Sequence, residues 1–216
     1  MFDELSEKIK NARIIPVVKM DDTEKAVPLA KALLEGGISA IEITFRTTEG
    51  EAGYKKIAEC IKKVSTEVPQ MLVGAGTVIN PSLAEKSVEA GAQFIVSPGF
   101  NPSTVDWCIA KNVPVYPGVN NPSLVEVALE KGLSVLKFFP AEVSGGTKML
   151  KALAGPFPTV KFMATGGISE KNVKEYFGCK NLVAVGGSWM VSETLINEKN
   201  WQEITRLSKE ALAALD

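Results

Sequence analysis

A short apolar segment followed by a longer amphipathic segment recurs eight times along this chain. The apolar segments predict β-strands over residues 13–18, 39–44, 70–75, 93–97, 113–116, 134–139, 160–164 and 182–185. The amphipathic segments predict α-helices over residues 24–35, 51–65, 81–90, 102–111, 122–131, 146–154, 170–177 and 201–215. Strands that alternate with helices form a parallel sheet, and eight units favour closure into an α/β fold, the (β/α)8 TIM barrel. An open, doubly wound sheet is the alternative.

The loops between these units are short, and no change of composition marks a second domain among the 216 residues. We therefore expect a single barrel domain over residues 1–216. Residues 1–12 are expected to form a helix packed on one end of the barrel. The reason is that Phe2, Leu5 and Ile9 would share one face of that helix.

Composition narrows the possible functions. The net charge of −1 gives no support for nucleic-acid binding, and no apolar run is long enough to span a membrane. The N-terminal residues lack the basic start and apolar run of a signal peptide, so we expect a cytoplasmic protein. Cys60, Cys108 and Cys179 lack metal-ligand spacing and are expected to be reduced. The chain contains no histidine, so catalysis must use Lys, Glu, Asp, Tyr, Ser or Thr.

Lys137 stands in the middle of the apolar strand predicted over residues 134–139. Because side chains alternate along a strand, Lys137 shares one face with Val135 and Phe139. Burial disfavours the charged ammonium, and a lysine that is neutral part of the time is a nucleophile that forms a Schiff base with a carbonyl. Alternatively, the lysine stem crosses apolar surface while its amine reaches water at the strand end.

Polar residues also occupy the ends of other predicted strands, where the chemistry of a barrel is located. Glu42 is expected to face the barrel interior, since Ile41 and Ile43 would face the helices. A buried carboxylate is costly unless it is paired or used, so Glu42 is a candidate catalytic group. A structural ion pair between Glu42 and Arg46 is the alternative. Thr77 follows the third strand, beside small residues that let the backbone approach a ligand.

Paired glycines follow the seventh and eighth predicted strands, as Gly166-Gly167 and Gly186-Gly187. Ser188 comes next, and we expect the second pair to open a short helix. Phosphate commonly binds at these two loops of a barrel, because backbone N–H groups and the positive end of a helix dipole face the anion. The two glycine pairs therefore predict a phosphate site.

Several motifs together resemble one known family, the 2-keto-3-deoxy-6-phosphogluconate (KDPG) aldolase and 4-hydroxy-2-oxoglutarate (KHG) aldolase family. The resemblance runs from about residue 14 to the C-terminus, and the motifs occur in the order of the family. They are Glu42 with Arg46, GAGT at 74–77, SPG at 97–99, KFFP at 137–140, GPF at 155–157, TGG at 165–167 and GGSW at 186–189.

The resemblance implies a class I aldolase that uses no metal or other cofactor and assembles as a homotrimer. It implies cleavage of KDPG to pyruvate and glyceraldehyde 3-phosphate in the Entner–Doudoroff pathway, and of KHG to pyruvate and glyoxylate. It also implies these roles: Lys137 forms the imine, Glu42 is the general acid/base, Arg46 and Thr77 lie near the pyruvate carboxylate, Pro98 and Phe139 line the pyruvate pocket, Thr165 lies near the substrate hydroxyls, and Gly166, Gly167, Gly187 and Ser188 hold the phosphate.

Other readings are compatible with the residues. The substrate could be the C4-epimeric 6-phosphogalactonate compound, or the chain could be a phosphate-binding isomerase or epimerase that needs no imine. It could also be a barrel kept as a ligand sensor or an assembly subunit. Lys19, at the end of the first strand, could assist the phosphate or simply be solvated. A nearby Glu42 favours the charged form of Lys137 whereas burial disfavours it, and the sequence leaves that balance open.

Overall fold

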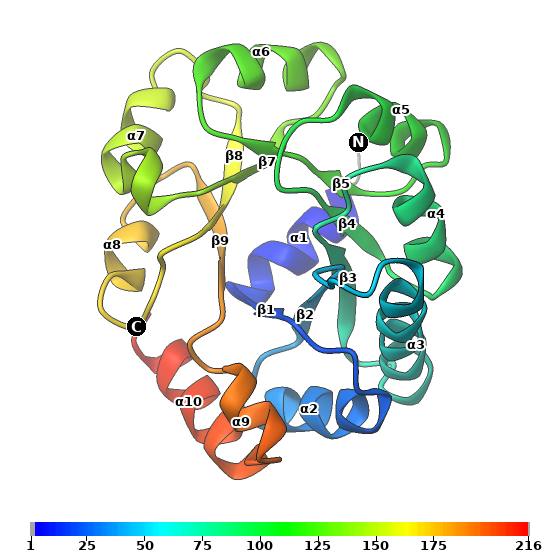
Figure 1. The fold of residues 1–216 in the computed structure, drawn as a ribbon. Coiled ribbons are helices and arrows are strands. Elements are labelled where there is room, and N and C mark those ends of the chain that lie inside the picture. The colour runs from blue at the N-terminus through cyan, green and yellow to red at the C-terminus, as the bar shows by residue number, and fades with distance from the viewer. Residues whose placement is uncertain (1–2, 216) are drawn as a thin grey trace.

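The strands form one parallel barrel surrounded by helices (Figure 1). This computed structural model describes residues 3–215. Around the barrel the strands follow the order β5-β4-β3-β2-β1-β9-β8-β7-β6, and every pairing is parallel. The expected (β/α)8 barrel is therefore confirmed, and the open doubly wound sheet is wrong.

The elements lie close to the predicted segments. The strands are β1 (Ile14–Val18), β2 (Ala40–Thr44), β3 (Leu72–Gly76), β4 (Phe94–Val96), β5 (Val115–Tyr116), β6 (Gly118–Val119), β7 (Val135–Phe138), β8 (Lys161–Thr165) and β9 (Leu182–Gly187). The helices are α1 (Asp3–Ala12), α2 (Thr23–Glu35), α3 (Glu51–Glu67), α4 (Pro81–Glu89), α5 (Pro102–Ala110), α6 (Pro122–Glu130), α7 (Gly146–Leu153), α8 (Val173–Phe177), α9 (Glu193–Asn197) and α10 (Trp201–Ala213), with a 3₁₀ turn η1 (Glu142–Ser144).

The fifth strand differs from its prediction because it consists of two pieces, β5 and β6, and the second piece lies beyond Tyr116. Pro117 separates the pieces, and a proline has no N–H to donate to a sheet. The carbonyl of Pro117 still accepts a hydrogen bond of 3.0 Å from the N–H of Lys137. Gly118 then pairs with Lys137 in the register of β6 and β7. The broken strand thus joins both halves of the barrel beside the candidate lysine.

Three helices begin with the same local device, an asparagine followed by a proline. The side chains of Asn80, Asn101 and Asn121 each accept a backbone N–H from the first turn of α4, α5 and α6. The proline that follows each asparagine occupies the first turn, where a missing N–H costs nothing. The expected helix starts at residues 81, 102 and 122 are therefore confirmed.

Alternate residues of the strands divide between two apolar clusters. Ile41 and Ile43 pack in the larger cluster, which lies between the strands and the surrounding helices. Ala40 packs in the smaller cluster inside the barrel, together with Ile15, Leu72, Phe94, Tyr116, Met163 and Ala184. The alternation therefore turns Glu42 toward the interior, as the sequence predicts.

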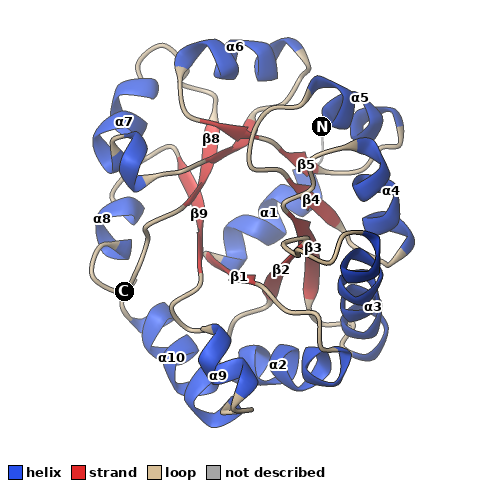
Figure 2. Ribbon diagram, in the orientation of Figure 1, coloured by secondary structure: helices blue, strands red, loops and turns tan. Residues whose placement is uncertain are grey.

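Helix α1 closes the end of the barrel where the strands begin (Figures 1 and 2). Ile9 and Ala12 are buried in the interior cluster, and Leu5 packs against it. The described residues of this helix thus pack on one barrel end, whereas Phe2 lies outside the described residues. Because α1 fills this end, a ligand has access to the interior from the opposite end.

No described helix combines the length and the apolar character needed to cross a membrane.

Two buried thiols give a prediction about reactivity. Cys60 on α3 and Cys108 on α5 are fully buried, and burial raises the pKa of each thiol to about 12. At pH 8 only about one thiol in 10⁴ is then ionised, and the thiolate is the reactive form. We expect both residues to remain unmodified by Ellman's reagent in the native protein and to react at once in guanidinium. Rapid native modification of either residue, located by peptide mass, would contradict this packing.

The same shifts predict the direction of a pH effect. A thiol with a raised pKa stabilises the folded state below its ordinary pKa of about 8.5, and this contribution is lost as the pH rises toward 12. Urea unfolding should therefore need less denaturant at pH 10 than at pH 8. A double variant, Cys60→Ala with Cys108→Ala, should lose less stability over this interval.

Candidate active site

Along the strands, the side chains that face the barrel interior change from apolar to polar two residues after the positions of the apolar interior cluster. Lys137 follows Val135 on β7, and Thr165 follows Met163 at the end of β8. Lys137 is 1% exposed and Thr165 is 5% exposed, so both side chains lie inside the barrel. The strand direction places this polar layer toward the C-terminal ends, where barrel enzymes hold their reactive groups.

Lys137 and Glu42 meet across the interior. The Lys137 Nζ lies 3.5 Å from the Glu42 Oε1, and Glu42 is fully buried. The alternative in which the Lys137 amine reaches water is therefore wrong. Within residues 3–215 Glu42 pairs with Lys137 and forms no ion pair with Arg46, so the structural Glu42–Arg46 pair is also wrong. A buried amine beside a buried carboxylate is an arrangement suited to proton exchange.

Glu42 has little space around it and one oxygen without a protein partner. A β-carbon on Gly76 would lie 2.6 Å from the Glu42 Cγ, so only glycine leaves room for this carboxylate. Among the described residues, no group hydrogen-bonds the buried Oε2 of Glu42 or the buried Oγ1 of Thr165. Buried polar atoms normally have partners, and atoms without one are frequent at catalytic or binding sites.

Arg46 and Thr77 come together, as the sequence suggests. The Nε of Arg46 donates a 3.0 Å hydrogen bond to the Oγ1 of Thr77. Thr77 has a φ of +58°, a strained conformation for a β-branched residue, just after β3. This hydrogen bond fixes one edge of the guanidinium and leaves its other N–H groups to face a ligand.

Phe139 and Pro98 follow β7 and β4. The ring of Phe139 lies beneath the amine of Lys137, with 5.0 Å between the Nζ and the ring centroid. Pro98 is half-buried after β4, and Gly118 approaches it so closely that a β-carbon there would collide with the Pro98 carbonyl. The structure thus brings Phe139 against Lys137 and holds Pro98 against the broken fifth strand.

The predicted phosphate residues line one cavity of about 140 Å³ at the C-terminal end of the barrel. Its lining includes Arg46, Phe139, Thr165, Gly166, Gly167, Gly187 and Ser188. Gly166 and Gly167 have φ values of +104° and +78°, which glycine adopts without strain. The site residues named from the last two loops therefore lie together beside Arg46.

The short helix after β9 begins later than the sequence suggests. We expected Gly186-Gly187 to open it, but α9 begins at Glu193, with Ser192 as its N-cap. The hydroxyl of Ser192 accepts the N–H of Leu195 at 3.3 Å, so this serine fixes the start of the helix. The glycines and Ser188 thus offer loop N–H groups rather than the first turn of α9.

Two residues beside the glycine loop are not recognisable as site residues from the sequence. Glu142 follows the KFFP motif in η1 and lies against Gly167, and Tyr176 on α8 donates a hydrogen bond to Glu142. Proximity to the KFFP motif was the available signal for Glu142. Tyr176 is 34 residues away along the chain, and nothing in its local sequence connects it with this loop.

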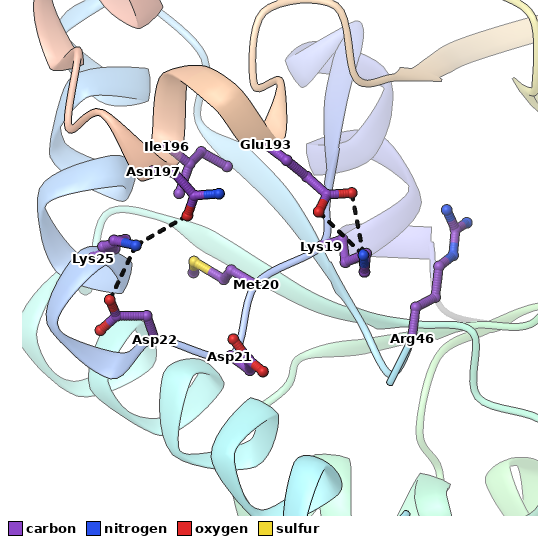
Figure 3. A pocket seen from close by; sticks show the side chains of 9 residues that line it. All are labelled: Lys19, Met20, Asp21, Asp22, Lys25, Arg46, Glu193, Ile196 and Asn197. Atoms are coloured by element: carbon purple, nitrogen blue, oxygen red, sulfur yellow. Dashed lines mark hydrogen bonds and ion pairs between the residues drawn. The ribbon is translucent and has the colours of Figure 1, made fainter. Parts of the chain in front are cut away.

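Lys19 lines a neighbouring cavity of about 160 Å³ between β1, α2 and α9 (Figure 3). Arg46 also lines this cavity. Its Nζ lies 3.1 Å from the Glu193 Oε2, and both side chains are exposed. In Figure 3 the Lys19 amine points toward Glu193, while the guanidinium of Arg46 stands apart from this pair. The structure therefore shows Lys19 as one half of a surface ion pair.

Within residues 3–215 no three Cys, Asp or Glu side chains gather as a set of metal ligands.

Comparison with known proteins gives consistent matches over nearly the whole chain. A family model described as KDPG and KHG aldolase matches residues 5–207. The chain is 43% identical to a 2-dehydro-3-deoxy-phosphogluconate aldolase of Haemophilus influenzae, over 97% of this chain and 95% of that protein. It is 39% identical to the KHG/KDPG aldolase of Escherichia coli, over 92% of this chain and 90% of that protein.

Solved structures agree. The fold is similar to that of KDPG aldolase from Legionella pneumophila with pyruvate captured as a covalent carbinolamine intermediate, with a TM-score of 0.88 and 40% identity over 95% of this chain and 97% of that one. It is also similar to the Zymomonas mobilis KDPG aldolase with 3-phosphoglycerate, with a TM-score of 0.87 and 36% identity over 98% of this chain and 95% of that one.

The contact between Gly76 and Glu42 generates a prediction. Gly76→Ala should push the Glu42 carboxylate away from Lys137, and a displacement of about 1 Å in a reactive group costs roughly 10²-fold in rate. Overpacking should also destabilise the fold by about 1–3 kcal/mol. Gly155→Ala is the matched control, because its β-carbon would meet its nearest atom at 3.5 Å. Turnover and urea unfolding test both variants, and a fully active Gly76→Ala protein would refute the tight packing.

Proposed function

The chain belongs to the KDPG and KHG aldolase family, and on that premise we propose that it cleaves KDPG to pyruvate and glyceraldehyde 3-phosphate. It is a class I aldolase, a lyase that breaks a carbon–carbon bond through a covalent lysine intermediate. The observation that carries the proposal is the buried Lys137 amine, which lies 3.5 Å from the Glu42 carboxylate at the C-terminal side of the barrel.

Lys137 supplies the nucleophile. Its neutral amine adds to the C2 ketone of the substrate, and loss of water gives a protonated imine. This cation accepts the electrons of the C3–C4 bond as the bond breaks. The Phe139 ring beneath the amine supports the positive charge, because the face of an aromatic ring attracts cations.

Glu42 moves the protons. Its carboxylate takes the proton of the C4 hydroxyl as the C3–C4 bond breaks, and glyceraldehyde 3-phosphate leaves. The remaining enamine is then protonated at C3, and hydrolysis of the imine releases pyruvate and restores Lys137. The Oε2 of Glu42, which has no hydrogen-bond partner within the described chain, is the oxygen available for these transfers.

Further residues position the two ends of the substrate. Arg46, held by Thr77, binds the pyruvate carboxylate, since a guanidinium presents N–H groups that match a carboxylate. Phe139 and Pro98 line the pyruvate pocket. The hydroxyl of Thr165 meets the substrate hydroxyls, which would give this buried group a partner. The N–H groups of Gly166, Gly167 and Gly187, with the Ser188 hydroxyl, bind the phosphate.

KHG is a second candidate substrate, because the Escherichia coli relative is named a KHG/KDPG aldolase. Its cleavage gives pyruvate and glyoxylate through the same imine and does not require the phosphate loops. We also propose that the protein is a homotrimer, as its family resemblance implies. Analytical ultracentrifugation of the intact protein tests this assembly directly.

The first prediction of this proposal concerns Lys137. Borohydride reduction in the presence of pyruvate should add a reduced pyruvyl group to the peptide that contains Lys137, because the reagent traps an imine. Lys137→Met should abolish the label. Lys161→Met, on the neighbouring strand β8 with its amine at the surface, should keep it. A label on any other lysine, or none in the unmodified protein, would refute the assignment.

The second prediction concerns Glu42. Glu42→Gln preserves size but removes proton transfer, so turnover should fall roughly 10²–10⁴-fold and pyruvate trapping on Lys137 should slow. Glu49→Gln changes an exposed glutamate that is also paired with a lysine, and it should leave turnover unchanged. Rates are compared well below each melting temperature. A Glu42→Gln protein with a near-native rate would show that the carboxylate is structural.

A further inference from the structure

We propose that Glu142 and Tyr176 form a brace that holds the Gly166-Gly167 loop in its phosphate-binding shape, without touching the substrate. The inference rests on the proposed function, because it assigns positioning residues to the phosphate site of that same reaction. Glu142 comes from η1 and Tyr176 from α8, so the brace joins the segment after the lysine strand β7 to the helix after β8.

The side chain of Glu142 lies directly against the glycine loop. A β-carbon on Gly167 would be 2.6 Å from the Glu142 Cγ and 2.7 Å from its Cβ. The methylene stem of Glu142 therefore occupies the space beside Gly167 and blocks movement of the loop in that direction. Any larger residue at position 167 would have to displace this stem.

The backbone ties the same two segments together. The N–H of Glu142 donates to the carbonyl of Gly166 at 3.0 Å, and the N–H of Ala141 donates to the carbonyl of Thr165 at 2.8 Å. These bonds extend the pairing of β7 and β8 into the loop that lines the cavity. Glu142 is thus hydrogen-bonded directly to the phosphate loop, and its displacement would shift that loop as well.

Tyr176 fixes the end of the Glu142 side chain. Tyr176 is 1% exposed, and its hydroxyl donates a hydrogen bond to the Glu142 Oε1. Burial, reinforced by the hydrogen bond to Glu142, raises the pKa of Tyr176, so the hydroxyl keeps its proton and remains a donor. Asn172, just before α8, donates its side-chain N–H to the carbonyl of Gly167 at 3.0 Å. The loop is therefore held from η1 and from α8 at once.

A preorganised loop binds its anion more tightly because less ordering is needed on binding. The brace also directs the Glu142 carboxylate toward Tyr176, and two negative groups close together would repel each other. Loss of the brace should therefore weaken recognition of the phosphate and leave chemistry at Lys137 intact. A brace should affect only the phosphate end of the substrate, whereas a general structural role should affect the phosphate end and the reaction at Lys137 alike.

The decisive variant is Tyr176→Phe, which deletes one hydroxyl. We expect its KM for KDPG and its Ki for inorganic phosphate to rise about five- to tenfold, the scale of the net contribution of one typical hydrogen bond. The kcat for KDPG, the KM for KHG and the borohydride trapping of pyruvate should match those of the unmodified protein. Tyr116→Phe is the control, because it makes the same deletion in the apolar cluster at the closed end of the barrel.

Variants at Glu142 test the hydrogen bond itself. Glu142→Gln keeps an oxygen that accepts from Tyr176 and keeps the stem beside Gly167, so its KM for KDPG should stay within about twofold of the original value. Glu142→Ala removes both features and should reproduce or exceed the effect of Tyr176→Phe. A Glu142→Gln protein as impaired as Glu142→Ala would overturn the brace.

Other outcomes separate this inference from the function on which it rests. An unchanged KM for KDPG in Tyr176→Phe, or an equal rise for KHG, would overturn the brace while pyruvate trapping still supports the aldolase. Ser188→Asp places a negative charge in the phosphate cavity and should impair cleavage of KDPG far more than cleavage of KHG. Equal losses would remove the phosphate site and the brace together. Absence of pyruvate trapping in the unmodified protein would refute the aldolase proposal itself.

Discussion

Lys137 and Glu42 lie in contact inside the barrel, and their burial restricts what the surrounding residues can be. Removing two ionisable groups from water costs several kcal/mol for each, which is comparable to the net free energy of unfolding of a whole domain. The cost is offset only where the two groups pair with each other. At 3.5 Å each offsets the burial of the other. They lie 95 residues apart, on strands that are not neighbours in the sheet. Only a closed barrel brings them together across its interior.

Glycines make the space that this contact needs. The interior of a TIM barrel is normally filled by bulky side chains. Here a β-carbon on Gly76 would lie 2.6 Å from the Glu42 Cγ, and one on Gly186 would lie 2.5 Å from the Thr165 Oγ1. The barrel therefore holds a polar layer by leaving out side chains at chosen strand positions. A larger residue at these positions would fill the interior at the expense of the reactive groups.

The two ends of the barrel differ because one is filled and the other is lined by loops. Helix α1 seals the end where the strands begin, with apolar residues on both sides of the contact. At the other end, the glycine loops, Arg46 and Phe139 surround one cavity. Parallel strands all finish at this end, so a strand-end residue reaches the cavity whatever its position in the chain. Glu142 and Tyr176 add support from outside the cavity.

From the sequence alone we could predict the barrel, the inward direction of Glu42, the face that Lys137 shares with Phe139, and the position of Thr77 and the glycine loops after strands of one barrel. Periodicity and strand direction are local properties, and local properties are visible in a sequence. The tertiary structure alone decided that Glu42 pairs with Lys137 instead of Arg46, that the fifth strand breaks at Pro117, and that Tyr176 contacts Glu142. These features depend on barrel closure and on which side chains then meet, and distances across a closed interior are not encoded in any single segment.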